Sequence, residues 1–214
     1  MPQLIVNEIF HSIQGESSRA GLPCVFVRLT ACNLRCTYCD TAYAFYEGKP
    51  MSVDEILTAV RQYGCRQVEM TGGEPLMQEG VYELMVLLCD EGYETLLETG
   101  GSLDIGKVDP RVKRIVDFKC PGSGMVKKNF WENVRHLKDG DEVKFVIGSR
   151  EDFDWSVGKI REHALDRKVP VLMSVVFGEL APLVLAGWIL ESGIQVRMQL
   201  QMHKYIWEPA ARGV

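Results

Sequence analysis

Short apolar runs alternate along the chain with longer segments that have a helical period. Residues 25–29 form a β-branched and aromatic run that is typical of a buried strand. Ser52 and Glu55 form a capping-box pattern, and the apolar residues that follow at helical spacing predict a helix. The same alternation continues to the last third of the chain. It predicts further strands at 67–70, 95–98, 114–118, 142–147, 169–176 and 195–200, and further helices at 81–88, about 151–166 and 181–191.

Strands that alternate with helices predict a parallel sheet joined by right-handed crossovers. The crossover between Lys119 and Glu142 has no strong helical period. The length of 214 residues is also below the roughly 250 that a complete eight-fold barrel needs. We therefore expect an α/β fold, a partial, modified TIM-like (β/α) barrel of about six parallel strands with fewer, irregular helices. Because no linker, repeat or low-complexity tract interrupts residues 1–214, we expect a single domain.

Unusual motifs follow four of the predicted strands. Cys32 follows the first core strand, the run from Thr71 to Pro75 the second, the run from Glu98 to Gly101 the third, and Lys119 the fourth. Ligands of parallel sheets gather where the carboxyl ends of the strands open into loops. These motifs are therefore expected to meet at one end of the sheet.

Three cysteines, Cys32, Cys36 and Cys39, lie within eight residues. A structural zinc ion takes four protein ligands, and the remaining Cys and His residues repeat no ligand pattern. The close spacing favours an iron–sulfur cluster over a zinc site or a redox dithiol. Three thiolates on a four-iron cluster leave one iron open to another ligand. The hydroxyl of Thr41 follows directly and is an oxygen ligand that magnesium accepts, although hydroxyls at such positions more often form turns.

The run from Thr71 to Pro75 carries two glycines that let the backbone approach a ligand closely. Glu74 beside them can accept hydrogen bonds from an ammonium group. The alternative is a tight turn from strand to helix, opened by Pro75. Next to the cysteine loop, ligand binding is the favoured interpretation.

Composition and charge narrow the class of protein. The net charge of −5 provides no basic field for nucleic acid, and no window approaches the about 18 apolar residues of a membrane helix. Residues 1–8 lack the pattern of a signal peptide. Seven cysteines, three of them clustered, do not form the spacing of a secreted disulfide framework. Cys24 and Cys89 are expected to be small buried hydrophobes. We expect a cytoplasmic protein whose partners include neither nucleic acid nor membranes.

The cysteine loop together with the run from Thr71 to Pro75 resembles the radical S-adenosylmethionine superfamily. That resemblance implies an open iron chelated by the amino and carboxylate groups of S-adenosylmethionine, with the Gly-Gly-Glu segment helping to bind the same amino group. Reductive cleavage would then give a 5′-deoxyadenosyl radical. Further segments, in order along the chain, are similar to the 7-carboxy-7-deazaguanine synthases: 8–16, 27–34, 39–41, 117–119 and 201–207.

This narrower resemblance implies ring contraction of 6-carboxy-5,6,7,8-tetrahydropterin to 7-carboxy-7-deazaguanine with loss of ammonia, a step toward queuosine. The radical would abstract hydrogen at C6 of the substrate and later return it, so that S-adenosylmethionine acts catalytically. The implied cofactors are a 4Fe-4S cluster, S-adenosylmethionine and Mg²⁺. Flavodoxin or ferredoxin is the implied electron donor, and a homodimer is the implied assembly.

The resemblance also implies roles for individual residues. Three positions depart from the family pattern, namely Ser17, Gly100 and Val175, and no contact maps to the tail 208–214. Glu16 and His203 are interpreted either as residues that orient the ligand contacts or as structural polar groups. The implied ligand sets are Cys32, Cys36 and Cys39 for the cluster; Thr41 for magnesium; Ile13, Gln14, Gly15, Arg28 (to the substrate carboxylate) and Thr71 for the pterin; and Gly73, Glu98, Asp117, Phe118, Lys119, Ser174, Val175, Val176 and Phe177 for S-adenosylmethionine.

Two other classes of protein share the cysteine spacing. One is a radical activase that makes a glycyl radical on a partner protein, and the other is a non-catalytic iron–sulfur module for electron transfer. An activase has no need of the segment 13–15 or of the segment 203–205, and an electron-transfer module would bind no S-adenosylmethionine.

Overall fold

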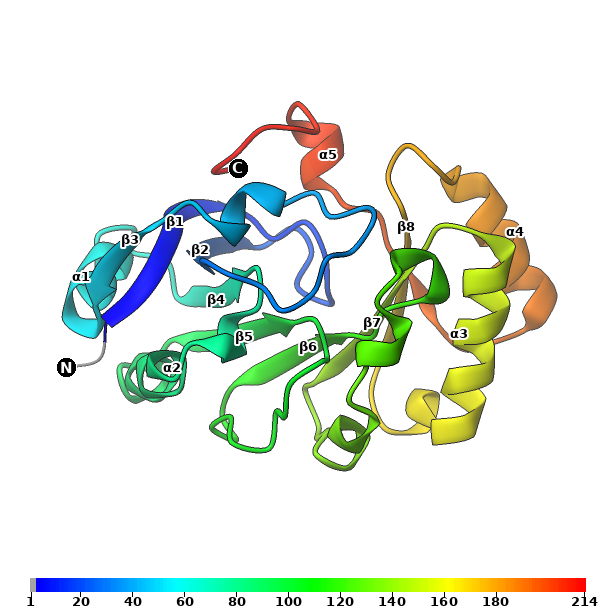
Figure 1. Cartoon of the computed structure of the whole chain (residues 1–214), viewed down its shortest axis with the longest axis horizontal. Helices are drawn as coiled ribbons and strands as arrows, with labels where there is room; N and C mark the ends of the chain where they lie inside the picture. Colours follow the sequence, from blue (N-terminus) through cyan, green and yellow to red (C-terminus); the bar gives the residue numbers. More distant parts are fainter. Residues whose placement is uncertain (1–2) are drawn as a thin grey trace.

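One curved, open sheet organises the computed structural model, which describes residues 3–214 (Figure 1). Its nine strands lie in the order β3-β1-β2-β4-β5-β6-β7-β8-β9. Neighbours from β2 to β9 are parallel, whereas β1 is antiparallel to both β2 and β3. The strands are β1 (Gln3–Ile13), β2 (Pro23–Leu29), β3 (Lys49–Ser52), β4 (Gln67–Gly72), β5 (Glu94–Thr99), β6 (Lys113–Asp117), β7 (Glu142–Ile147), β8 (Val171–Val175) and β9 (Arg197–Met198).

Four helices cover the outer face of the sheet, and a fifth lies over its opening beside the C-terminus (Figure 1). The helices are α1 (Val53–Arg61), α2 (Gly80–Asp90), α3 (Arg150–His163), α4 (Pro182–Ser192) and α5 (His203–Ile206). The crossover from β6 to β7 carries three short 3-10 helices, Pro121–Ser123, Val126–Lys128 and Trp131–Arg135, in place of an α-helix. Within residues 3–214, none of the helices has the length and apolar character that crossing a membrane requires.

The predicted partial barrel with irregular helices is confirmed, and the capping box of Ser52 and Glu55 begins α1 as expected. The strand expected at 195–200 was too long, since only Arg197 and Met198 pair with β8 at the end of the sheet. The helix expected at about 151–166 ends at His163, because Ala164 adopts a left-handed conformation with φ of 50°. The antiparallel strands β1 and β3 were not predicted from the sequence.

The two faces of the sheet have different chemistry, because successive side chains of a strand point to opposite faces. Val68 and Met70 of β4 belong to the core formed with the helices. Glu69 and Thr71, which alternate with them, line an internal cavity instead. The registers place Arg28 beside Thr71 and Asp117 beside Lys144. The inner face is thus a polar wall built from several strands.

Candidate active site

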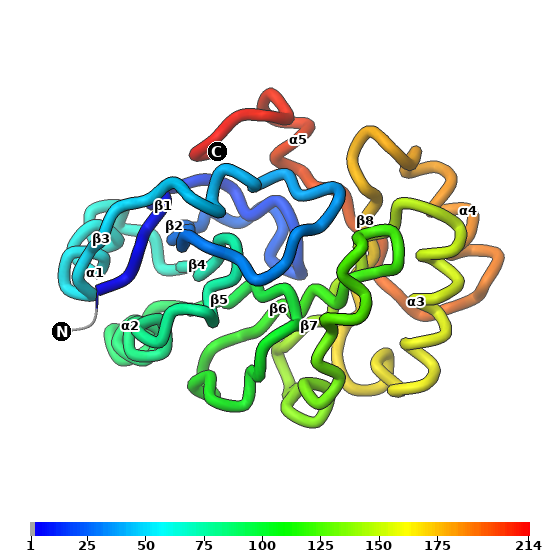
Figure 2. Tube along the Cα trace, viewed as in Figure 1, coloured from blue at the N-terminus to red at the C-terminus, as the bar shows by residue number. Residues whose placement is uncertain are grey.

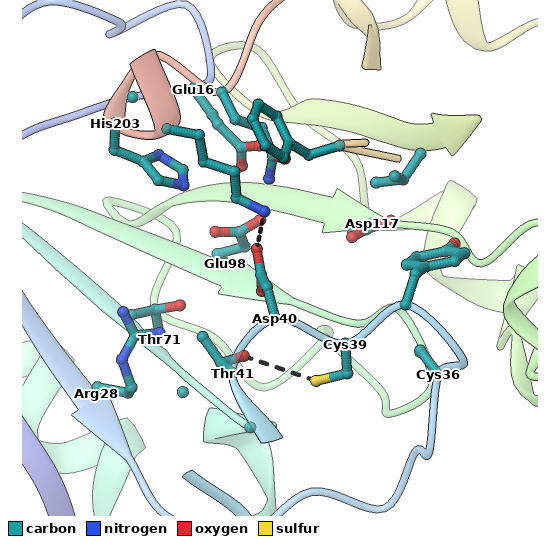
Figure 3. Close-up of a pocket in the computed structure, with 18 of the residues that line it drawn as sticks. Glu16, Arg28, Cys36, Cys39, Asp40, Thr41, Thr71, Glu98, Asp117 and His203 are labelled. Atoms are coloured by element: carbon teal, nitrogen blue, oxygen red, sulfur yellow. Dashed lines mark hydrogen bonds and ion pairs between the residues drawn. The ribbon is translucent and has the colours of Figure 1, made fainter. Parts of the chain in front are cut away.

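A cavity of about 640 Å³ lies at the carboxyl ends of the parallel strands (Figure 3). Its walls are the loops that follow β2, β4, β5, β6 and β8, and its other boundaries are residues 13–16, α5 and the tail 209–214. Figure 2 shows that the C-terminal segment passes above the first third of the chain. Both ends of the chain therefore contribute to one cavity.

The loop 32–41 carries Cys32, Cys36 and Cys39, and all three thiols are free and line the cavity. The start of this loop is fixed by a backbone hydrogen bond from the Glu74 amide to the Ala31 carbonyl, at 2.8 Å. Its middle is fixed by Thr37, whose amide and hydroxyl donate to the carbonyls of Ser123 and Gly122 at 3.1 and 2.8 Å. The β2, β4 and β6 loops thus hold the three thiols in place together.

The arrangement of the thiols fits a polynuclear cluster. Within residues 3–214, no three His, Cys, Asp or Glu side chains converge as the ligands of a single zinc ion would. Three thiols that face one cavity from a single loop fit a group in which each thiolate binds a different iron. Burial raises the pKa of the Cys36 thiol to about 11, so that cluster loading has to displace its proton.

The floor of the cavity is held by a buried lysine. Lys144 Nζ lies 2.5 Å from Glu16 Oε2 and 2.7 Å from Glu98 Oε1, and the lysine side chain is only 5% exposed. Burial alone would raise the pKa of Glu98, but the ammonium of Lys144 outweighs burial and lowers it. Burial would likewise lower the pKa of Lys144, and Glu16 and Glu98 raise it. Glu98 and Lys144 are therefore both charged, and the Lys144 ammonium also contacts Glu16.

The mouth of the cavity is covered by α5. Lys204 Nζ pairs with Asp40 Oδ2 at 2.7 Å, which ties α5 to the residue that follows Cys39 (Figure 3). On the other side, the Met202 amide donates to the Gly15 carbonyl at 3.0 Å. Further out, the Arg212 guanidinium lies 3.8 Å from the ring centroid of Tyr43. These contacts link the cysteine loop, residues 13–16 and the C-terminal segment.

Comparison with known proteins agrees with this geometry. Residues 27–121 match the model of the radical SAM superfamily. The 7-carboxy-7-deazaguanine synthase of Chlorobaculum tepidum is 47% identical over 99% of this chain and 97% of its own length. The 7-carboxy-7-deazaguanine synthase of Koribacter versatilis is 44% identical over 98% of this chain and 99% of its own length. The chain belongs to the 7-carboxy-7-deazaguanine synthases, within the radical SAM superfamily. It is therefore a radical SAM enzyme. The crystal structure of QueE from Escherichia coli shares the fold, with a TM-score of 0.76 at 21% identity over 94% of this chain and 95% of that one.

Most residues to which the synthase family assigns a role line the cavity. Arg28 lies there with its side chain 14% exposed, where its Nε donates to Glu8 Oε1 at 2.7 Å. The arginine is therefore a half-buried residue of the cavity wall, and its ion pair with Glu8 does not lie on the open surface. The other assigned residues that line the cavity are Ile13, Gln14, Gly15, Glu16, Cys32, Cys36, Cys39, Thr41, Thr71, Gly73, Glu98, Asp117, Lys119, Val176, Phe177 and His203.

Three assigned residues do not line the cavity. The Phe118 ring stacks on Trp131 at 4.4 Å between centroids, on the core side of the sheet. Val175 also packs in that core, and the Ser174 side chain is buried. A cofactor in the cavity would meet these residues through the backbone or through their neighbours Asp117, Lys119 and Val176.

Glu74 differs from the sequence expectation. Its carboxylate is fully buried, lies outside the cavity wall and accepts hydrogen bonds from the Thr99 hydroxyl, the Gly100 amide and the Leu76 amide at 2.8 to 3.1 Å. It is not placed to accept a hydrogen bond from an ammonium group in the cavity. Glu74 instead joins the β4 loop to the β5 loop, and the backbone of Gly73 is what faces the cavity.

Sequence reasoning missed several residues of the site, namely Glu69, Asp40, Lys144 and Lys204. Lys144 left a detectable signal, because it is a charged residue at an alternate position within the strand expected at 142–147. A lysine in the middle of such a strand has to point into a polar space or find a partner. Asp40 and Lys204 lie 164 residues apart in the chain, and no local pattern connects them.

Proposed function

We propose that this enzyme converts 6-carboxy-5,6,7,8-tetrahydropterin to 7-carboxy-7-deazaguanine with loss of ammonia, as a step toward queuosine. The observation that carries the proposal is that one cavity of about 640 Å³ is lined both by the three free thiols of loop 32–41 and by Gln14 and Arg28. A volume of this size suits a small ligand beside a cofactor. The names of the relatives support the same reaction.

Each group has a proposed role. Cys32, Cys36 and Cys39 would hold a 4Fe-4S cluster, which would supply an electron for the reductive cleavage of S-adenosylmethionine. Arg28 binds the substrate carboxylate, because a planar guanidinium matches a carboxylate in a bidentate manner. The pterin also contacts Ile13, Gln14, Gly15 and Thr71, and S-adenosylmethionine contacts Gly73, Glu98, Asp117, Lys119, Val176 and Phe177, with backbone contacts from Phe118, Ser174 and Val175.

Magnesium is proposed at Thr41. The Thr41 hydroxyl lies at the cavity wall, 3.8 Å from Cys39 Sγ. Oxygen ligands of this type suit magnesium, which also takes oxygen atoms from substrate and water. Glu16 is proposed to orient the floor of the cavity through Lys144, and His203 to keep α5 against Gly15.

The electron donor is proposed to be flavodoxin or ferredoxin. Arg35, Lys127 and Lys128 are exposed on and beside the cysteine loop, and none of the three forms an ion pair within residues 3–214. A local positive surface on a chain with a net charge of −5 suits an acidic electron carrier. We further propose a cytoplasmic homodimer of single-domain chains. One continuous sheet and one main core support the single domain.

The experiment is anaerobic incubation of the reconstituted, reduced enzyme with S-adenosylmethionine and the carboxylated tetrahydropterin, followed by mass spectrometry. We expect the deazaguanine acid and ammonia. Cleavage of S-adenosylmethionine without any pterin product would favour the activase. Electron transfer without binding of S-adenosylmethionine would favour the electron-transfer module.

A further inference from the structure

Glu69 is a buried carboxyl group on the cavity wall to which neither the family resemblance nor the mechanism assigns a role. It lies in the middle of β4, is 2% exposed, and lines the cavity. Its neighbours in register are Phe26 on β2 and Leu96 on β5. A carboxyl group between two apolar side chains is costly unless a ligand or a partner uses it.

The partner of Glu69 is the side chain of Gln14. Gln14 Nε2 donates to Glu69 Oε2, and Gln14 Oε1 accepts from the Glu16 amide at 3.1 Å. Both ends of the Gln14 side-chain amide are thereby engaged inside the protein, so that the pterin contact proposed for Gln14 is one of its backbone. Gln14 holds Glu69 in place, and Glu69 Oε1 accepts no hydrogen bond within residues 3–214.

The surrounding charges leave Glu69 without a counter-ion. Lys144 is shared between Glu16 and Glu98, and Arg28 pairs with Glu8. Within residues 3–214, no cation lies within ion-pair distance of Glu69. Burial first, and then the charges of Glu98 and Glu16, raise the pKa of Glu69 well above its ordinary range, while Lys144 and Arg28 oppose the shift. The carboxyl group is therefore set to receive hydrogen-bond donors from outside the protein.

The ligand chemistry that suits such a group is a pair of adjacent N–H donors in one plane. A carboxylate accepts two parallel hydrogen bonds from this pattern, as it does from a guanidinium. A 2-amino-4-oxopteridine carries that pattern at its 2-amino group and N3. We propose that Glu69 is the specificity-determining residue that recognises the 2-amino and N3–H edge of the pterin, with Gln14 as its positioning residue. This inference rests on the proposed function.

A proton change should accompany recognition. Two N–H donors favour the carboxylate form, so that Glu69 loses its proton when the pterin binds. Below the raised pKa of Glu69 the empty site is protonated, and the apparent affinity for the pterin rises with pH in that range. The groups that face Glu69 are Gln14 and Glu16 from the β1–β2 loop, Arg28 from β2, Glu98 from β5 and Lys144 from β7.

The test compares two ligands on two variants of the cluster-loaded enzyme with S-adenosylmethionine bound. The ligands are the carboxylated tetrahydropterin and the same compound without its 2-amino group. In the wild type we expect the compound without the amino group to bind about tenfold more weakly or worse, as for a lost charge-assisted hydrogen bond. Glu69→Gln keeps an acceptor for Gln14. In this variant we expect the compound without the amino group to bind only about threefold more weakly than the pterin, or less.

The matched control is Gln67→Met. Gln67 points to the same face two residues earlier on β4 and does not line the cavity. We therefore expect this variant to keep the wild-type difference in affinity between the two ligands. Calorimetry of the wild type in two buffers with different ionisation enthalpies gives a second measurement, which needs no variant to fold. We expect release of a proton on binding.

Two outcomes would overturn the assignment of Glu69. One is an equal preference for the 2-amino compound in the wild type and in Glu69→Gln, and the other is binding of the pterin without proton release. If the wild type binds neither compound, the proposed function itself fails. If it binds and converts the pterin while Glu69→Gln keeps full discrimination, only the present inference fails.

Discussion

The most consequential single residue in the floor of the cavity is Lys144, because it neutralises two buried carboxylates. In Lys144→Met, Glu16 and Glu98 lose their counter-ion, and we expect a loss of about 3–5 kcal/mol in the free energy of unfolding. The pKa of Glu98 is now lowered by Lys144; without the lysine, burial raises it. When the pKa of a carboxyl group is higher in the folded than in the unfolded protein, the free energy of unfolding falls as the pH rises. The variant should therefore be more destabilised at pH 8 than at pH 5.

Urea unfolding at both pH values measures this effect. The matched control is Lys113→Met, because Lys113 pairs with Glu94 at 2.5 Å with both side chains about one-third exposed. We expect the control to lose about 1 kcal/mol or less. An equal loss in the two variants would show that Lys144 does not hold the floor together.

At the residue scale, the sequence indicates which groups are available but not what they bind to inside the protein. The cysteine spacing predicted three thiols at one cavity. The Gly-Gly-Glu segment likewise predicted a carboxylate that binds a ligand. The Glu74 carboxylate instead accepts hydrogen bonds from Thr99, Gly100 and Leu76. Glu69 is five residues earlier and does face the cavity. Glu69 lies within β4, at a position that alternates with the core residues Val68 and Met70. Glu74 lies beyond the end of β4, where its side chain caps the short helix that begins at Pro75.

At the scale of elements, the helix-poor crossover from β6 to β7 depends on one buried ion pair. Asp141 is fully buried and accepts hydrogen bonds from Arg114 and from Lys138, including two from the Arg114 guanidinium at 2.5 and 3.0 Å. In Asp141→Ala we expect a loss of about 3–5 kcal/mol in the free energy of unfolding. Asp154→Ala, which removes an exposed i,i+4 partner of Arg150, should cost about 0.5 kcal/mol. Equal values from chemical denaturation would contradict this account.

The position of α5 over the cavity depends on Gly15. A Cβ atom at this position would meet the ring and the backbone nitrogen of His203. In Gly15→Ala we expect α5 to move away, the KM for the pterin to rise about tenfold, and the C-terminal segment to become more sensitive to protease. The control Gly158→Ala lies on α3, where an added Cβ contacts nothing within 4 Å, and should raise stability by about 0.5–1 kcal/mol. An unchanged KM in Gly15→Ala would show that α5 does not close the site.

Central strands were easier to predict than the edges of the sheet. A strand with neighbours on both sides is apolar throughout on its core face. For β7 this apolar pattern predicted residues 142–147, which are the bounds that the structure shows. The strands β1 and β3 have exposed positions and antiparallel partners that no local pattern identifies. Residues 195–200 have an apolar character, but pairing with β8 is limited to two residues at the end of the sheet.

At the scale of the whole molecule, the surface charge around the cysteine loop governs the encounter with the electron donor. In Lys127→Glu/Lys128→Glu we expect reduction by an acidic flavodoxin to slow by about tenfold at low salt, and reduction by dithionite to stay unchanged. The control Lys168→Glu changes an exposed charge just before β8, at the opposite end of the strands. Stopped-flow reduction measures all three proteins. Equal slowing in the control would contradict a docking surface beside the cysteine loop.

The architecture as a whole unites cofactor and substrate by placing loops from both ends of the chain around one cavity. The carboxyl ends of parallel strands provide the cysteine loop and the polar wall, and the antiparallel β1 leads into residues 13–16, which line the cavity beside α5. The C-terminal segment then covers the mouth. Enclosure of this kind protects a radical from water and from oxidants.

The most direct measurement is anaerobic turnover with S-adenosylmethionine at about one-tenth of the concentration of the carboxylated tetrahydropterin. If the radical abstracts a hydrogen and later returns it, the cofactor is regenerated, and we expect 7-carboxy-7-deazaguanine in several-fold excess over the S-adenosylmethionine supplied. Accumulation of 5′-deoxyadenosine with no deazaguanine acid would contradict the proposed reaction.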